Sequence, residues 1–374
     1  MTGHAKLSAS GSHRWLYCSG SVEAESTLPN TTSFFAEEGS AAHELAEIAL
    51  TKLAGDCSKM IGQQLIEYNA FAVTQEMANH VQVYTDYVRN LGGEQSYEQR
   101  ADFGEWVPDG WGTADAIVIN SDTIHVIDLK YGQGLRVDAE ENSQGILYAL
   151  GAYAEYELFH DFQRVVITIV QPRLDHISEW EITIPELLKR GEWIKQKAEE
   201  ASKPKAKRTP GESQCNWCKA KATCPALMKA AHDAIIGDFE ELDFAPVNTL
   251  TDGQLRNALD SKALVIGWLD AVEAHIKAKV ENGEGFNGYK LVNGRSSRSW
   301  SNEEMAEKVL TIELEDAAFE RKLLSVAKAE KALGKTKRDL IDGLVLKSAG
   351  KPTLVKESDP RPSIGTSADD FDFN

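Results

Sequence analysis

The sequence predicts an α/β protein with an αβββαβ core and a helical C-terminal extension. Two short stretches rich in Ile and Val, at 113–119 and 123–129, flank the turn-forming pair Asn120-Ser121 and are expected to form a hairpin. Apolar residues at helical spacing precede and follow this hairpin, so we expect helices around a small sheet. A chain of 374 residues is long enough for one principal domain with a second one appended.

The elements of the predicted core follow in a simple order. One helix is expected over about 41–55 and a second over 70–91, both before the strands. The first strand, 96–103, has the weakest pattern of the three. After the hairpin, a helix capped near Asn142 or Ser143 leads to a buried strand in "RVVITIVQP" and a further strand in "SEWEITI".

Composition shifts along the chain suggest three regions. Residues 1–235 are expected to form the principal domain, which includes all five cysteines. Residues 236–356 read as a mainly helical accessory domain, with charged helical patterns over 252–282 and 302–334. Residues 357–374 read as a disordered acidic tail.

The charge balance argues against a protein that coats polyanions in general. Lys and Arg number 40 against 58 Asp and Glu, a formal net charge of -18, although a local basic cleft stays compatible with this balance. The basic run 203–208 could follow a phosphate backbone, but a solvated loop is the favoured interpretation. No apolar run approaches the roughly 18 residues that would span a bilayer, and the N-terminus lacks a signal-peptide pattern, so a cytoplasmic protein is expected.

Asp115, Asp128 and Lys130 form a candidate catalytic group on the predicted hairpin. Side chains two residues apart on a strand point to one face, so Asp128 and Lys130 share a face, and Asp115 on the neighbouring strand can converge with them. Two carboxylates offer oxygen ligands suited to Mg²⁺ or Mn²⁺, and the ammonium can orient or help deprotonate a water that attacks phosphorus. Taken alone, an Asp-x-Lys tripeptide is also common at ordinary strand ends.

Further residues accompany this group in a defined order. His43 lies in "EGSAAHELAE" on the first helix, and Gln144 and Tyr148 stand four apart on one face of the later helix. The series His, Gly-x-x-Asp beginning at Gly112, Asp-x-Lys and Gln-x-x-x-Tyr resembles the RecB-like branch of the PD-(D/E)XK nucleases. The resemblance implies a restriction-endonuclease-like core and a metal-dependent deoxyribonuclease.

The resemblance also implies a role for each residue. The Mg²⁺ or Mn²⁺ ligands would be His43, Asp115, Asp128 and the backbone carbonyl of Leu129. Lys130 would assist the attacking water, while Gln144 and Tyr148 would position the motif and the DNA. Asp128 stands where many members of the family carry Glu, which keeps the ligand chemistry but shortens its reach.

The cysteines form a second signature. Without an export signal, they are expected to be reduced thiols or metal ligands. Cys18 before the core and the run Cys215, Cys218 and Cys224 after it are similar to the iron–sulfur RecB-like nucleases, such as the AddB nuclease domain and the CRISPR adaptation exonucleases. The resemblance implies a [4Fe–4S] cluster that ties the N-terminus to the far side of the domain, although four thiolates could equally bind zinc. Cys57 is expected to be a free thiol.

Longer segments, from "HAKLSASGSHRWLYCSGSVEAE" to "GYKLVNGRSSRSWSNEE", look like a family of phage- and prophage-encoded RecB-like nucleases over nearly the whole chain. That resemblance implies an exonuclease of phage recombination or replication that acts on DNA together with a single-strand-binding or annealing protein. The alternatives are a catalytically silent DNA-binding scaffold of the same fold and a structure-selective endonuclease. The tail "SADDFDFN" is a candidate docking segment for such a partner. The alternative is a tail that only keeps the protein in solution.

Overall fold

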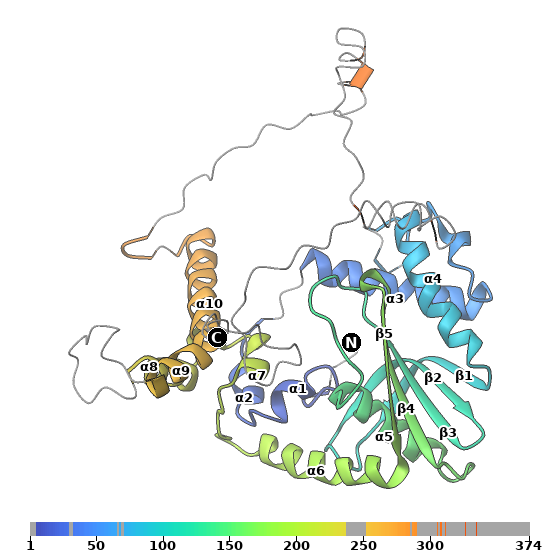
Figure 1. Ribbon diagram of the computed structural model, residues 1–374, viewed down its shortest axis with the longest axis horizontal. Coiled ribbons are helices and arrows are strands. Elements are labelled where there is room, and N and C mark those ends of the chain that lie inside the picture. The colour runs from blue at the N-terminus through green and yellow to red at the C-terminus, as the bar shows by residue number, and fades with distance from the viewer. Residues whose placement is uncertain are drawn as a thin grey trace, which may run out of the picture. The chain divides into compact units, whose positions relative to one another are not determined.

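The computed structural model describes residues 5–29, 33–65, 67–68, 71–236, 252–284 and 286–289, and a few single helical positions after residue 304 (Figure 1). The chain divides into two units, Met1–Leu291 and Val292–Asn374, and the elements below belong to the first. The predicted domain limits after residues 235 and 356 stay predictions. The expected tail and most of the expected helix over 302–334 lie outside the described residues.

A five-stranded mixed sheet forms the centre of the first unit, with the strands in the order β1-β2-β3-β4-β5. Neighbouring strands are antiparallel except β3 and β4, which run parallel and are joined by a helical crossover, as parallel strands require. The expected strands are all present, with the bounds Glu94–Asp102 (β1), Trp111–Asn120 (β2), Thr123–Leu129 (β3), Arg164–Gln171 (β4) and His176–Thr183 (β5).

Helices cover both faces of this sheet (Figure 1). Helices α3 (Phe34–Lys52) and α4 (Gln75–Asn90) pack on one face, and α5 (Ser143–Tyr156) and α6 (Ile184–Ser202) pack on the other. The mixed α/β class and the order of elements in the predicted core are therefore observed. None of the helices in the described ranges is both long and apolar enough to cross a membrane.

Shorter elements complete the described part of the chain. The remaining helices are α1 (Ser12–Trp15), α2 (Ser21–Glu25), α7 (Glu212–Asn216), α8 (Pro225–Ile236), α9 (Asp252–Asp260) and α10 (Lys262–Glu281). The 3-10 turns are η1 (Cys57–Met60), η2 (Pro172–Leu174) and η3 (Lys221–Thr223).

Polar caps set where the main helices begin. Asn142 caps α5 as expected, because its side chain accepts a hydrogen bond of 3.0 Å from the Gly145 N–H. Helix α3 begins earlier than the expected residue 41, since Ser33 caps it. The first residues after this cap, Phe34 and Phe35, are 65% and 77% exposed. The first turn of α3 therefore lacks the apolar periodicity of a buried helical face, which is the pattern that predicted the rest of the helix.

The N-terminal segment is joined to the segment 203–211 by backbone contacts. The Gly20 N–H donates to the Lys207 carbonyl at 2.9 Å, and the Lys205 N–H donates to Glu23 Oε2 at 2.9 Å. A Cβ on Gly20 would stand 2.5 Å from the Ala206 carbonyl oxygen, so this approach needs a glycine. The backbone of the basic run at 203–208 therefore holds the N-terminal segment against the rest of the domain.

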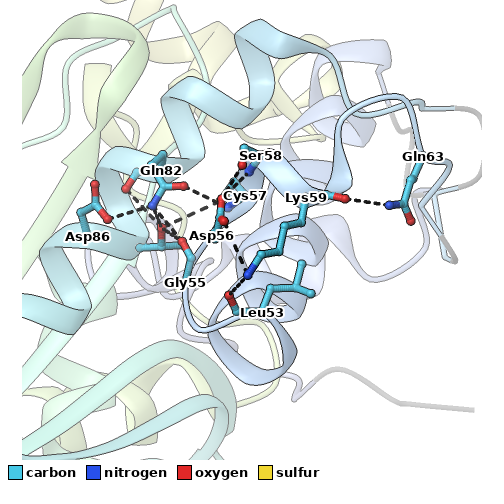
Figure 2. A network of polar contacts seen from close by, with 10 residues as sticks. Leu53, Gly55, Asp56, Cys57, Ser58, Lys59, Gln63, Gln82 and Asp86 are labelled. Atoms are coloured by element: carbon cyan, nitrogen blue, oxygen red, sulfur yellow. Dashed lines mark hydrogen bonds and ion pairs between the residues drawn. The ribbon is translucent and has the colours of Figure 1, made fainter.

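Cys57 lies in a polar network that joins the end of α3 to α4 through η1 (Figure 2). The Gln82 side chain accepts a hydrogen bond from the Cys57 N–H at 2.9 Å and donates to the Gly55 carbonyl at 2.8 Å. The Cys57 sulfur contacts the Thr85 hydroxyl at 3.8 Å. Burial raises the pKa of this thiol to about 11, so Cys57 is a neutral core group at physiological pH.

Replacement of Gln82 by Ala should lower the free energy of unfolding by about 1–3 kcal/mol, because the partly buried Cys57 N–H loses its acceptor and the Gly55 carbonyl keeps only the Thr85 hydroxyl as a donor. Equilibrium denaturation in urea measures this change. Gln63→Ala is the matched control, since exposed Gln63 only donates to the Lys59 carbonyl in the same network. Equal effects of the two substitutions would contradict the assignment of Gln82 as the joining residue.

Candidate functional site

The pairing of β2 and β3 brings the two predicted acids together. The last pair of the hairpin joins Ala116 to Ile127, so the next position of this register sets Asp115 opposite Asp128. Asp115 Oδ2 accepts a hydrogen bond of 2.7 Å from the Leu129 N–H across the hairpin. Both acids have little exposed side-chain surface, 12% for Asp115 and 3% for Asp128.

Helix α3 adds His43 to this pair. His43 Nδ1 lies 3.2 Å from Asp115 Oδ1. Burial works against the imidazolium, but the Asp115 carboxylate outweighs it and raises the pKa of His43 to about 9. Burial likewise opposes the ionised Asp115, and the charge of His43 outweighs it, so the pKa of Asp115 lies below its usual value. The two groups therefore form an ion pair near neutral pH.

Asp128 and Lys130 form the second half of the site. Lys130 Nζ lies 2.8 Å from Asp128 Oδ2 and donates a hydrogen bond to Oδ1 at 3.1 Å. Burial opposes the ammonium, but Asp128 outweighs it and the pKa of Lys130 is raised. Burial raises the pKa of Asp128 despite the attraction of Lys130, and nearby Asp115 raises it further. Lys130 is therefore charged at neutral pH and acts as a hydrogen-bond donor.

Helix α5 holds Lys130 from the other side. Lys130 Nζ donates to Gln144 Oε1 at 3.1 Å, and Gln144 Nε2 donates to the Tyr148 hydroxyl at 3.2 Å. Tyr148 is 5% exposed, and burial raises its pKa above the usual value. Gln144 and Tyr148 lie four residues apart on one face of α5, as predicted, and together they orient Lys130.

Gly112 makes room for Tyr148. A Cβ on Gly112 would stand 2.8 Å from Tyr148 Cε1, closer than carbon atoms approach without a shift. The glycine of the Gly-x-x-Asp motif therefore has a packing reason, because the ring that supports Gln144 rests directly on the strand. The sequence alone offered no such reason for this glycine.

Glu98 is a residue of the site that sequence reasoning missed. It lies on β1, and one ligand atom each of His43, Glu98 and Asp115 lie within 4.8 Å of one another. This set of one imidazole and two carboxylates could hold a divalent cation. The weak pattern of the first strand gave no signal for Glu98, because its place opposite Asp115 depends on strand register.

The four predicted cysteines line one small cavity. Cys18 follows α1, while Cys215, Cys218 and Cys224 come from the segment that runs from α7 to α8. Cys57 does not belong to this cavity. The fold thus brings together thiols that are separated in the sequence by the whole α/β core.

Backbone N–H groups contact two of these sulfur atoms. The Thr209 N–H donates to Cys18 Sγ at 3.3 Å, and the Gly211 N–H donates to Cys215 Sγ at 3.5 Å. Burial raises the pKa of Cys215, and it raises that of Cys218 to about 11. These thiols would stay protonated near neutral pH unless a metal displaced the proton.

Comparison with known proteins gives a family and a weak structural likeness. A model of the family described as "Protein of unknown function (DUF2800)" matches residues 4–362. The crystal structure of SSO0001 is 15% identical over 55% of this chain and 93% of that chain, with a TM-score of 0.24. So low a TM-score has no bearing on the fold.

Gly112→Ala should destabilise the protein by about 1–3 kcal/mol, because the added methyl group forces Tyr148 out of its position. Chemical denaturation measures the loss. Gly134→Ala is the control, since nothing lies within 4 Å of its Cβ position. A fully stable Gly112→Ala variant would refute the packing role.

Proposed function

The chain belongs to the DUF2800 family, and we propose that it is a metal-dependent DNA exonuclease with a restriction-endonuclease-like core. The observation that carries the proposal is the convergence of His43, Asp115, Asp128 and Lys130 at one end of the β2–β3 hairpin. The antiparallel strands β1 to β3, followed by α5 and the parallel strand β4, are in keeping with such a core.

The residues present fit a Mg²⁺ or Mn²⁺ ion. Asp128 is 2% exposed, yet its Oδ2 has no hydrogen-bond partner and only the nearby Lys130 ammonium for compensation. A buried carboxylate oxygen in this state is well suited to a cation. The predicted ligands were His43, Asp115, Asp128 and the carbonyl of Leu129, whose N–H meanwhile holds Asp115 in place.

When bound, the ion would polarise the scissile phosphate and stabilise the charge that develops on it. Lys130 is charged and fixed between Asp128 and Gln144, so it can orient the attacking water by donating a hydrogen bond. Its raised pKa argues against proton abstraction by Lys130 before a metal binds. Gln144 and Tyr148 keep the ammonium in this orientation, which is a positioning role.

The cysteine cavity could hold a [4Fe–4S] cluster, which the resemblance favours over tetrahedral zinc. N–H···S hydrogen bonds, such as those to Cys18 and Cys215, also commonly tune the reduction potential of iron–sulfur clusters.

We place this activity in phage recombination or replication, in the cytoplasm of a bacterial host. The support is the likeness of the sequence to phage- and prophage-encoded nucleases. The proposed partners are DNA and a phage single-strand-binding or annealing protein.

Asp115→Asn, Asp128→Asn and Lys130→Ala should each reduce DNA cleavage by on the order of 10³-fold or more, because each removes part of one charged unit. The losses should not add in double variants. Cleavage of end-labelled linear DNA with Mg²⁺ or Mn²⁺ measures the effect. Surface variants Asp161→Asn and Lys189→Ala are the matched controls.

Three other results would change the assignment. Binding of DNA without cleavage of any substrate would favour the silent scaffold. Cleavage of circular DNA would favour the structure-selective endonuclease. A wild-type rate for Lys130→Ala would refute the proposed role of the lysine.

Anaerobically purified protein should be brown, and Cys18→Ser or Cys215→Ser should lose the broad visible absorption and lower the melting temperature. Cys57→Ser is the matched control and should keep the colour, because Cys57 lies in the separate network of Figure 2. Metal analysis should find iron. Stoichiometric zinc without iron in the anaerobic protein would contradict the cluster.

A further inference from the structure

The pairing of β1 with β2 is interrupted at one residue, Glu98. Pairs run from Glu94 opposite Ile119 to Tyr97 opposite Ala116, and they resume with Gln99 opposite Ala114. The skipped position would set Glu98 opposite Asp115.

Glu98 also has a left-handed backbone, with a φ of 45°. This conformation is rare for residues other than glycine and is energetically unfavourable for them. The other non-glycine residues with positive φ in the described ranges lie in turns: Ala54, Asp109, Ser121, Glu141, Asp175 and Lys205. Glu98 alone among them stands inside a strand.

Glu98 continues a row of acids across the sheet. The β1–β2 register sets Glu98 opposite Asp115, and the β2–β3 register sets Asp115 opposite Asp128. Like charges in directly opposed positions destabilise a sheet. Burial, followed by the charge of Asp115, raises the pKa of Glu98 to about 7.

A buried tyrosine supplies a second, independent observation. Tyr84 on α4 is 1% exposed, and its hydroxyl has no hydrogen-bond partner. Tyr84 belongs to the same buried cluster as Ala116 and Ile127, the strand neighbours of Asp115 and Asp128. Burial raises the pKa of Tyr84, and the charges of Asp115, Asp128 and Glu98 raise it further. An unpaired buried donor beside an acidic row is expected where a hydrated cation completes the hydrogen bonding.

We propose that Glu98 is a ligand of the divalent cation and that it acts with His43 and Asp115. Their ligand atoms lie within 4.8 Å of one another, so Glu98 stands beside two of the ligands already proposed. The inference deepens the proposed function, because it adds a ligand to the same site. A set that includes an imidazole also favours Mn²⁺ over Mg²⁺, which prefers ligands that are all oxygen.

The test is a calorimetric titration of the full chain with Mn²⁺ and with Mg²⁺ in the absence of DNA, together with the thermal shift that each cation causes. Glu98→Gln should weaken Mn²⁺ binding by on the order of 10- to 100-fold and remove most of the Mn²⁺-induced rise in melting temperature. Glu94→Gln, an exposed change on the same strand, should leave both unchanged.

A second variant separates a ligand from a merely structural residue. Glu98→Gly removes the carboxylate and also relieves the left-handed backbone, so the metal-free protein should be at least as stable as wild type. It should nevertheless lose Mn²⁺ affinity. A structural residue would instead cost stability without changing the Mn²⁺-induced shift.

Wild-type Mn²⁺ affinity in both Glu98 variants would overturn the inference, and so would a wild-type protein that binds neither cation. The proposed function is tested separately by cleavage. If Asp115→Asn abolishes Mn²⁺ binding and cleavage while Glu98→Gln alters neither, the nuclease stands and the inference fails. If Mn²⁺ binding needs Glu98 but no DNA is cleaved, the inference stands and the nuclease fails.

Discussion

The Asp115 carboxylate joins segments that are far apart in the chain. One oxygen accepts the Leu129 N–H across the hairpin at 2.7 Å, and the other lies 3.2 Å from His43 on α3. A carboxylate this little exposed is costly unless both oxygens are compensated, so the hairpin and α3 are held in one arrangement. Asp128 and Lys130 belong to the same hairpin, and their positions follow from that arrangement.

The cysteine cavity and the acidic site are physically connected through α1. Cys18 lies just after this helix and lines the cavity. At the start of α1, the Ser12 hydroxyl lies 2.6 Å from the hydroxyl of Ser143, which precedes Gln144 on α5. A metal held by the cysteines would therefore also steady the first turn of the helix that orients Lys130.

Helices and strands with a buried face were predictable from local pattern. The hairpin was evident because Ile and Val fill both strands, and α5 because Asn142 caps an apolar helix. The start of α3 was missed, since Phe34 and Phe35 are exposed and carry no signal of burial. The contact of the Gly20 N–H with the Lys207 carbonyl was missed as well, because backbone groups leave no trace in side-chain type.

The sequence by itself determined which chemical groups are present and in what order: a histidine before the strands, two acids and a lysine on the hairpin, and cysteines on either side of the core. These follow from residue type and from the two-residue period of a strand, which are local properties. Tertiary structure alone decided that Glu98 stands beside Asp115 and that Gly112 must admit the ring of Tyr148. Both depend on register and on packing between segments distant in sequence, and the free energy that selects them comes from contacts that no local pattern encodes.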